Sequence, residues 1–525
     1  MSDAAVPVLI VGAGPTGLVL ALWLTKQGVR VRIVDKAAQP GTTSRAVGVQ
    51  ARTLEMYDQM GLADALIDSG VRVQALHLWV GGKSAARVPF GEIGRGLSPY
   101  PYLLTYGQDE HERLLVARLA ELGVHVERQV ELAGFTQDAD VVRATLRDVL
   151  GAETTCTAQY LAGCDGAHSA VRQGIGAGFP GGTYAQLFYV ADVVATGQAI
   201  NDEVHVDLDE ADLLAVFPLK GAGHARYIGT VRAETEARGS EHTFADVSDR
   251  AMQKMKLETS EVRWFSTYRV HHRVADTFRG GRAFLLGDAA HIHSPAGGQG
   301  MNTGIGDAIN LSWKLASVLD GRAAESLLAS YEQERIAFAR RLVATTDRGF
   351  TLASSPGRIA AFVRMRIFPV VAPVLTTFGP VRRFMFRSIS QLVVRYRDSA
   401  LSSGDEGEVR GGDRLPWIPG LTGSADNFAP LRSFDWQVHV YGTPSADVAS
   451  TCQSLGLPLH AFAWTPEARR KGMQEGSAYL VRPDGYLAGM FGAARANELR
   501  AYFSARGIVR AEIPARDAPP GARRS

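Results

Sequence analysis

The fold is decided by two short runs, VLIVGAGPTG at residues 8–17 and VRIVD at residues 31–35. Four apolar β-formers lead into a G-x-G-x-x-G turn. An apolar helical run follows from Leu18 to Leu24, and Gly28 ends it before the second β-rich stretch. Strand, tight turn, helix and strand in this order form the βαβ unit of dinucleotide-binding domains. The opening of the chain therefore predicts a nucleotide site.

The three glycines of the turn have separate physical tasks in such a unit. Gly12 allows the sharp turn, and Gly14 lets backbone N–H groups approach a pyrophosphate at the positive end of the helix, while Gly17 lets helix and strand pack closely. Asp35 ends the second strand, where a carboxylate accepts hydrogen bonds from ribose hydroxyls. A G-x-G-x-x-G sequence alone is often only a turn, but a strand, helix and acid at these distances favour nucleotide binding.

The overall composition is that of an ordinary globular protein. The chain has 525 residues, of which 46% are hydrophobic and 21% charged, so we expect about two to three domains. The formal net charge of +2 gives no strong field for nucleic acid, and the basic residues form no single run. We therefore expect no nucleic-acid partner.

Cysteine usage and hydropathy indicate where the protein resides. Cys156, Cys164 and Cys452 are an odd, widely spaced set, which excludes a disulfide framework and a metal-ligand or C-x-x-C pattern. The first strand begins after about seven residues, which leaves no room for a signal peptide. The most membrane-like stretch, residues 359–378, is interrupted by two arginines and two prolines, so we expect no membrane span. These features favour a reducing, cytoplasmic location.

Two polar side chains lie near the predicted nucleotide. Arg45 belongs to a polar loop at residues 40–48, directly after the βαβ unit. A structural or solvated arginine and a guanidinium aimed at the pyrophosphate are both compatible with this position, and the sequence leaves the two interpretations open. Gln108 lies at the N-terminal edge of a predicted helix that begins QDEHERLL and ends at Gly123.

Two further stretches place a glycine-containing turn after a strand. Residues 160–172 predict a short strand, an Asp165-Gly166 turn and a helix capped by Ser169. Residues 281–302 predict a buried strand that ends at Gly287-Asp288 and a glycine-rich loop, and a helix follows over residues 303–319. Backbone N–H groups and a helix dipole then face one point, which suits an electron-rich ring.

The pair His291 and His293 alternates like residues at the end of a strand. Two such histidines are compatible with a metal site, but no carboxylate stands at ligand spacing beside them. We therefore favour packing or hydrogen bonding for both and predict no metal.

Taken together, these motifs resemble a known family. The glycine motif at residues 12–17, CDGAHS at residues 164–169, and GDAAH at residues 287–291 with Pro295 resemble the group A flavoprotein aromatic monooxygenases in order and separation. GQGMNTGIGDA at residues 298–308 and WKLA at residues 313–316 are similar to the phenol, pentachlorophenol and aromatic polyketide hydroxylase branch. The resemblance covers about residues 6–345. VRPDG at residues 481–485 resembles the thioredoxin-like domain of that branch, but without C-x-x-C we expect no redox role.

The resemblance implies an α/β (α+β) multidomain fold with a Rossmann-like FAD-binding domain, a β-sheet substrate domain and a C-terminal thioredoxin-like domain. We expect the FAD-binding domain at residues 1–180, with a β insertion at about 71–107, and at 276–400 with a helical region. The substrate sheet then spans 181–275, the thioredoxin-like domain 401–515 and a disordered tail 516–525. The expected roles of the C-terminal domain are packing or homodimer formation.

The resemblance also implies FAD as the cofactor and assigns its contacts. Asp35 would hold the adenosine ribose, Arg45 and Gln108 the phosphate and ribityl portions, and Asp288 the ribityl hydroxyls, while Asp165 would serve FAD and the nicotinamide cofactor together. Pro295 and the backbone of residues 298–302 would border the isoalloxazine ring. The implied cofactor-binding set is Gly12, Gly14, Pro15, Thr16, Gly17, Asp35, Lys36, Arg45, Gln108, Asp165, Asp288, Pro295, Gly298, Gly300, Met301 and Asn302.

The activity that the resemblance implies is hydroxylation of a phenolic or polycyclic aromatic substrate. NADH or NADPH reduces the flavin, dioxygen forms a C4a-hydroperoxyflavin, and the ring attacks the distal oxygen, helped by a base that deprotonates the phenol. Tyr227, His224, Tyr106 and His77 lie in the β-rich region, but each fits a core or surface position better, so we assign no catalytic residue. A flavin-dependent dehydrogenase or oxidase, or a non-catalytic flavin-binding partner in a biosynthetic complex, is the alternative.

Overall fold

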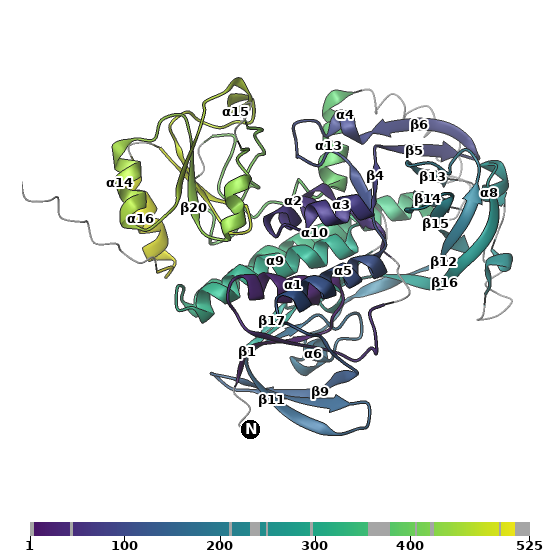
Figure 1. Ribbon diagram of the computed structural model, residues 1–525, viewed down its shortest axis with the longest axis horizontal. Coiled ribbons are helices and arrows are strands. Elements are labelled where there is room, and N and C mark those ends of the chain that lie inside the picture. The colour runs from purple at the N-terminus through teal and green to yellow at the C-terminus, as the bar shows by residue number, and fades with distance from the viewer. Residues whose placement is uncertain are drawn as a thin grey trace, which may run out of the picture. The chain divides into compact units, whose positions relative to one another are not determined.

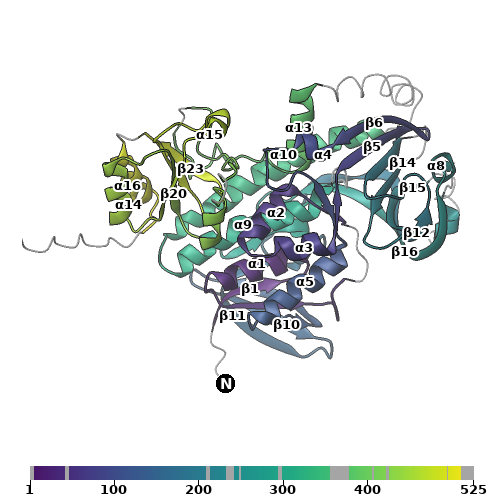
Figure 2. The same ribbon diagram turned by 45° about the horizontal axis from the view of Figure 1, so that its top comes forward.

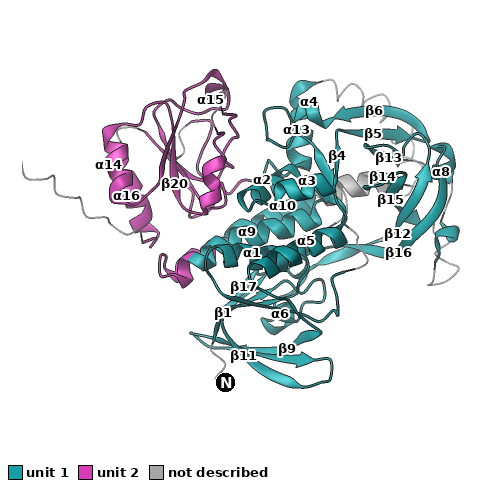
Figure 3. Cartoon of the chain, viewed as in Figure 1, with its two compact units in different colours: residues 1–316, 331–394 teal, residues 317–330, 395–525 magenta. Residues whose placement is uncertain are grey.

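The protein is described here from a computed structural model (Figure 1). The residues that it describes are 5–41, 46–208, 213–231, 242–247, 250–293, 298–354, 378–404, 407–420, 425–492 and 495–509. They divide into two compact units, residues 1–316 with 331–394 and residues 317–330 with 395–525, which Figure 3 shows in different colours. Both units mix helices and strands, and the predicted α/β class is confirmed.

The first sheet of unit 1 is built on the predicted βαβ unit. Strands β18, β11, β1, β2 and β8 run parallel in that order, and an antiparallel hairpin, β9 and β10, extends β11. The strands are β1 (Val6–Val11), β2 (Val31–Asp35), β8 (Glu127–Arg128), β9 (Val130–Gln137), β10 (Val142–Asp148), β11 (Glu153–Gly163), β17 (Arg279–Gly280) and β18 (Ala283–Leu285).

Helices cover this sheet because their apolar faces need burial. Helix α1 (Pro15–Lys26) starts with a proline at its first position, which suits the fixed φ of that residue. Its residues 18–24 are all fully buried, and α5 (Gln108–Glu121) packs beside it (Figure 1). The shorter helices of this part are α2 (Ala51–Gln59), α3 (Ala63–Ser69), α4 (Phe90–Ile93) and α6 (Ala170–Gly174).

The second sheet of unit 1 has eight strands in the order β19-β16-β12-β15-β14-β13-β5-β6. One face packs on α8 (Arg250–Lys254), which lies beside β14 in Figure 2. The strands are β5 (Ala75–Val80), β6 (Lys83–Pro89), β12 (Gly181–Thr196), β13 (Val204–Leu208), β14 (Leu213–Pro218), β15 (His224–Val231), β16 (Glu258–Val274) and β19 (His291–Ile292).

The insertion expected at about residues 71–107 divides between two sheets. Strands β5 and β6 join the second sheet, because β5 pairs in parallel with β13. A separate three-stranded sheet contains β3 (Gly48–Val49), β7 (Leu103–Thr105) and β4 (Val71–Val73). Part of the insertion therefore belongs structurally to the sheet that we predicted at residues 181–275.

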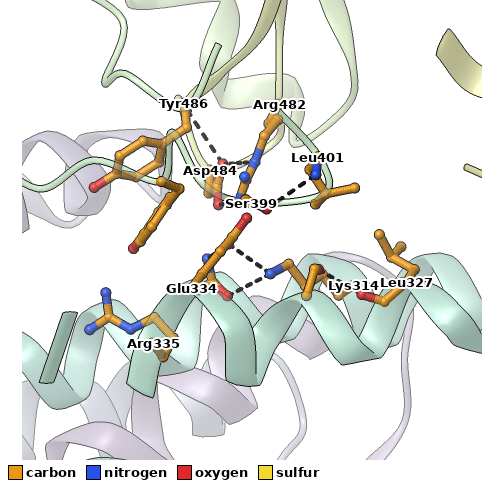
Figure 4. Close-up of polar contacts among 12 residues, drawn as sticks. Lys314, Leu327, Glu334, Arg335, Ser399, Leu401, Arg482, Asp484 and Tyr486 are labelled. Carbon is orange, nitrogen blue, oxygen red and sulfur yellow. Dashed lines mark hydrogen bonds and ion pairs between the residues drawn. The ribbon is translucent and has the colours of Figure 1, made fainter. Parts of the chain in front are cut away.

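Long helices complete unit 1 and enclose a buried ion pair. They are α9 (Gly300–Leu319), α10 (Ala329–Ser354) and α13 (Gly379–Ile389). Lys314 Nζ lies 2.9 Å from Glu334 Oε2 and donates to Asn310 Oδ1 at 2.8 Å, as Figure 4 shows for the first two residues. Both charged side chains are fully buried, so each needs the other to offset its lost hydration.

Unit 2 contains a four-stranded sheet in the order β21-β20-β22-β23. Its elements are β20 (Gln437–Tyr441), α14 (Ala446–Ser454), β21 (Leu459–Phe462), α15 (Pro466–Arg470), β22 (Ala478–Val481), β23 (Leu487–Phe491) and α16 (Ala496–Ala505). In the VRPDG segment, Arg482 forms a buried bidentate pair with Asp484 at 3.0 and 2.6 Å (Figure 4). The tail predicted at residues 516–525 lies outside the described residues.

Candidate active site

Three of the predicted motifs meet at one edge of the first sheet. Val11, Gly163 and Leu285 lie side by side at the carboxyl ends of the parallel strands β1, β11 and β18. The residues that follow them are the glycine turn, Asp165 and Asp288. Ligands of open parallel sheets bind at this edge, so the strand order places the three motifs where a nucleotide would bind.

Only glycine fits at two positions where β1 leads into α1. Gly12 has φ +102°, and a Cβ there would lie 2.2 Å from the carbonyl oxygen of Cys164. A Cβ on Gly17 would lie 2.0 Å from the carbonyl oxygen of Gly12. The close approach of β1, α1 and β11 therefore depends on these residues, as the sequence predicted.

Gly14 is different, because it borders open space. It has φ −75°, which any residue adopts, and a Cβ there would meet no atom within 4 Å. The N-terminus of α1 has no side-chain cap and no acidic residue in its first turn. A pyrophosphate binds where free backbone N–H groups at a helix N-terminus border open space. This end of the site therefore fits FAD.

The carboxylate of Asp35 accepts two backbone hydrogen bonds, one of them from the glycine turn after β1. Its Oδ2 accepts a hydrogen bond from the N–H of Ala13 at 2.6 Å, and its Oδ1 accepts one from Ala37 at 2.7 Å. A carboxylate has about four lone-pair directions, so it retains acceptor capacity for ribose hydroxyls. The neighbouring Lys36 is exposed.

Gln108 lies at the first position of α5, half-buried, and its orientation is set by a residue that the sequence did not indicate. Its Nε2 donates to Glu112 Oε1 at 2.8 Å, and Glu112 Oε2 accepts from the N–H of Gly41 at 2.9 Å. Burial raises the pKa of Glu112. Glu112 thus joins Gln108 to the loop after β2, in which Arg45 lies outside the described residues.

Asp165 has an unsatisfied acceptor. Its Oδ2 accepts a hydrogen bond from Val171 N–H at 3.2 Å, while Oδ1 is buried without a partner among the described residues. Burial raises the pKa of this carboxyl group. Buried polar atoms are nearly always hydrogen-bonded, so an orphan oxygen at this edge fits a ligand that donates to it.

A buried network of hydrogen bonds to Asp307 holds the turn that carries Asp288. Asp288 itself is exposed, and the adjacent Gly287 donates its N–H to Asp307 Oδ2 at 3.0 Å. The same oxygen lies 2.7 Å from His291 Nε2, and Arg335 Nε donates to Asp307 Oδ1 at 2.5 Å. Although burial opposes its ionisation, Arg335 and His291 lower the pKa of Asp307.

The network also explains His291, for which we predicted packing or hydrogen bonding. The Nε2 of His291 pairs with Asp307, and the ring is buried. The part of the chain that the structure describes contains no group of three or more His, Cys, Asp or Glu side chains placed to hold a metal ion.

The side chain of Asn302, in the first turn of α9, holds the start of this helix to β3 and α2. Its Oδ1 accepts from Gln50 N–H at 3.0 Å and from Thr53 Oγ1 at 2.7 Å, and its Nδ2 donates to the carbonyls of Gly48 and Gly298, both at 2.9 Å. Gly298 has φ +62° and borders open space. Gly300 and Met301 are half-buried, and Pro295 lies outside the described residues.

The second sheet presents an aromatic and polar face to this region. Phe217, Arg226, Asp192 and Trp264 form one cross-strand row over β14, β15, β12 and β16. Arg226 pairs with Asp192 through two bonds of 2.6 and 2.7 Å, and its Nη1 donates to the carbonyl of Ala46 at 3.0 Å. This face is therefore joined directly to the loop that follows β2.

A second row on the same face is mostly apolar. It consists of Val206, Ala215, Ile228, Val190 and Ser266, paired across five strands. Val206 and Ile228 are only half-buried. The opposite face is closed by α8 and a hydrophobic cluster, so this face, where Val206 and Phe217 pack at the edge of a second cluster, is the one that a flat apolar ligand could contact.

The four side chains considered as bases are each buried or hydrogen-bonded within the protein. Tyr227 is fully buried in the cluster on the α8 face, and His224 begins β15, where its Nδ1 lies 3.1 Å from the carbonyl oxygen of Lys220. Tyr106 donates to the carbonyl of Glu110 at 3.2 Å, and His77 pairs with Glu203. Core or surface roles for all four remain a prediction.

Comparison with known proteins assigns the family. A model described as FAD binding domain matches residues 5–346, and the chain therefore belongs to this FAD-binding family. It is similar to 6-methylpretetramide 4-monooxygenase of Streptomyces rimosus, with 39% identity over 411 residues, 76% of this chain and 71% of that protein. Pentachlorophenol 4-monooxygenase of Sphingobium chlorophenolicum is 32% identical over 422 residues, 79% of this chain and 76% of that protein.

A solved structure extends the similarity beyond the family match. OxyS anhydrotetracycline hydroxylase from Streptomyces rimosus superposes with a TM-score of 0.78 at 27% identity, over 97% of this chain and 100% of that chain. The predicted resemblance, fold class, FAD cofactor and class of FAD-dependent aromatic monooxygenase are thereby confirmed. Among the described residues, no helix has the length and apolar character needed to cross a bilayer.

Proposed function

We propose that this chain hydroxylates a phenolic or polycyclic aromatic substrate, using bound FAD, dioxygen, and NADH or NADPH. One observation carries the proposal: Arg226, on the aromatic face of the second sheet, hydrogen-bonds Ala46, at the end of the loop that follows Asp35. A nucleotide-binding edge and a face suited to an aromatic ring therefore adjoin within one compact unit.

The residues proposed to hold FAD divide by their chemistry. The N–H groups around Gly14 and the start of α1 would bind the pyrophosphate, and Asp35 the ribose. Asp288 would accept from ribityl hydroxyls, and the backbone of residues 298–302 would donate to the ring. Arg45, Lys36, Gln108 and Pro295 remain part of the predicted set. Bound flavin supplies the electron transfer and oxygen chemistry, and the protein supplies orientation and exclusion of water.

The proposed substrate site is the face of the second sheet opposite α8. Phe217 and Trp264 are half-buried aromatic side chains at the two ends of the Arg226–Asp192 row. Aromatic rings prefer offset or edge contacts with other aromatic rings. The apolar row beside them adds contact area, and the paired guanidinium and carboxylate are the charged groups that meet polar substituents of the ring.

The relatives support a substrate of this class. One is named for 6-methylpretetramide, another for pentachlorophenol and a third for anhydrotetracycline. We also propose a cytoplasmic location, because the chain's three cysteines are all free thiols. The domain boundaries given above, a thioredoxin-like identity for residues 401–515 and a homodimer remain proposals.

Gly14→Ala tests the cofactor site without disturbing the fold. The added methyl group meets no protein atom within 4 Å and the φ is already allowed, so we expect unchanged unfolding of the FAD-free protein. The methyl would occupy the pyrophosphate cradle, and the FAD dissociation constant should rise by about tenfold or more. Gly134→Ala, which also points into open space but in the β9–β10 hairpin, is the matched control.

Substrate-triggered turnover tests the activity. In air, a phenolic panel should contain a compound that accelerates NAD(P)H oxidation and is itself hydroxylated. Oxidation of the organic substrate without added oxygen would instead indicate a dehydrogenase or oxidase. FAD binding without turnover on any compound would indicate a non-catalytic partner.

A further inference from the structure

A glutamine in an unfavourable backbone conformation follows helix α13. Gln391 has φ +57°, in the left-handed region that side chains other than glycine rarely adopt, and it is buried. Such a residue costs about 1 kcal/mol or more and persists only where its surroundings require it. Its side-chain contacts therefore need an explanation.

Gln391 donates side-chain hydrogen bonds to the residue before α9 and to the first turn of that helix. Its Nε2 donates to Gln299 Oε1 at 2.8 Å and to Thr303 Oγ1 at 2.9 Å. In return, Gln299 Nε2 donates to the carbonyl of Ile389 at 3.2 Å. Gln299, Thr303 and Gln391 are all buried, so each unmade bond would leave a desolvated polar group.

The turn at residues 388–391 is also fixed on its other side. The carbonyl of Ser390 accepts a hydrogen bond from Arg52 N–H, at the start of α2, at 3.2 Å. On α13 itself, Phe386 packs in one hydrophobic cluster with Val204 of the second sheet. Helix α13 and the turn after it therefore contact the second sheet, α2 and residues 299–303 at the start of α9.

We propose that Gln391 is a positioning residue for the flavin, which acts by clamping Gln299 and thereby fixing the backbone N–H groups of residues 298–302. The inference rests on the proposed role of this loop beside the isoalloxazine ring. The left-handed turn aims the amide of Gln391 at Gln299, and the Nε2 of Gln299 donates to the backbone carbonyl of Ile389 in the same turn. Loss of the clamp leaves the fold intact but lets the loop donors move away from the ring.

The test uses Gln391→Met in the full-length holoprotein, since methionine is unbranched and similar in size but cannot donate. We expect the FAD dissociation constant to rise about tenfold. We also expect the reduction potential of the bound flavin to become more negative, because loop donors that stabilise charge on the reduced ring are less well aimed. Gln129→Met is the matched control, because Gln129 also has φ +58° but is exposed in the β8–β9 turn.

Gln299→Met is a second variant that tests the same proposal, and it serves this purpose if Gln391→Met does not fold. It removes the acceptor of the same bond, so it should cause the same changes, and the double variant should be no worse than either single one. The inference is overturned if FAD affinity and potential of the folded variants match those of Gln129→Met, or if the two effects add. Absence of FAD from the wild-type protein would instead contradict the proposed function.

Discussion

Asp307, on helix α9, accepts a hydrogen bond of 2.7 Å from Nε2 of His291, the last residue of the GDAAH motif. Both side chains are almost fully buried. The same carboxylate holds the N–H of Gly287 and the guanidinium of Arg335. One buried anion therefore fixes the turn from which Asp288 projects, although the GDAAH motif of that turn ends before Asp307.

Asp307→Asn should destabilise the protein strongly, because it leaves the buried Arg335 without its counter-charge. Breaking one partner of a buried pair costs about 3–5 kcal/mol, measured as the free energy of unfolding at neutral pH. Asp320→Asn is the control, because Asp320 pairs with Arg322 on the surface at 3.0 Å with both side chains largely exposed, a pair worth about 0–1 kcal/mol. Equal losses in the two variants would contradict the structural role of Asp307.

Asp165→Asn should have the opposite effect on the FAD-free protein. Burial raises the pKa of Asp165, so the folded state holds its proton more tightly than the unfolded state, whose pKa is about 3.9. The destabilisation caused by burying the charged carboxylate is therefore absent below about pH 3.9 and reaches its full size above the raised pKa. At neutral pH the asparagine variant should be at least as stable as the wild type, and this difference should vanish in acid, as thermal unfolding across pH would show.

Asp165→Asn should also weaken ligand binding. Its effects on binding and on stability can therefore be told apart. The orphan Oδ1 of Asp165 is the atom that we expect a ligand to meet. Asp165→Asn should therefore raise the dissociation constant of FAD or the KM for NAD(P)H. If Asp165→Asn were less stable at neutral pH and bound its ligands as well as the wild type, both predictions would be contradicted.

Asp288→Ala should reduce FAD retention with little effect on folding, since Asp288 is exposed in the turn that follows β18. A hydrogen bond to a charged group contributes about 1.5–3 kcal/mol, which corresponds to about a tenfold or larger loss of affinity. FAD titration followed by fluorescence measures it, with the exposed Asp140→Ala in the β9–β10 hairpin as control. Identical titrations of both variants would refute the assignment of Asp288 to the ribityl chain.

Cys452→Ala should leave NAD(P)H oxidation and hydroxylation unchanged. Cys452 is the single cysteine of unit 2, and thiol exchange within one chain needs two thiols. Burial raises its pKa to about 11, so almost no thiolate exists at neutral pH. Loss of turnover in a folded, flavin-loaded variant would show that the C-terminal unit has a chemical role after all.

The sequence predicted the parts of the site that depend on local pattern. The βαβ unit, the turn at Asp165 and the strand that ends at Gly287 are each encoded within about 30 residues, through hydrophobic periodicity and glycine placement. It could not predict the buried partners, because these come from distant segments. Gln391 and Gln299 are 92 residues apart, and Arg226 and Ala46 are 180 residues apart.

The same limit explains the divided insertion at about residues 71–107. Alternating apolar residues predicted strands there, but the sheet that β5 joins is decided by its parallel pairing with β13. Alternation fixes which residues share a face and carries no information about the partner strand. Asp307 shows the corresponding limit for polar residues, since an acid within an apolar helix gives no local sign of its partner.

The most direct test of the account is the origin of the oxygen atom in the product. The wild-type protein, loaded with FAD, should be incubated with NAD(P)H, ¹⁸O₂ and a substrate from the phenolic panel that accelerates NAD(P)H oxidation. We predict a product heavier by one ¹⁸O atom, with the second atom recovered in water. A product that contains oxygen from water, or one oxidised without any added oxygen, would contradict the assignment of this chain as an aromatic hydroxylase.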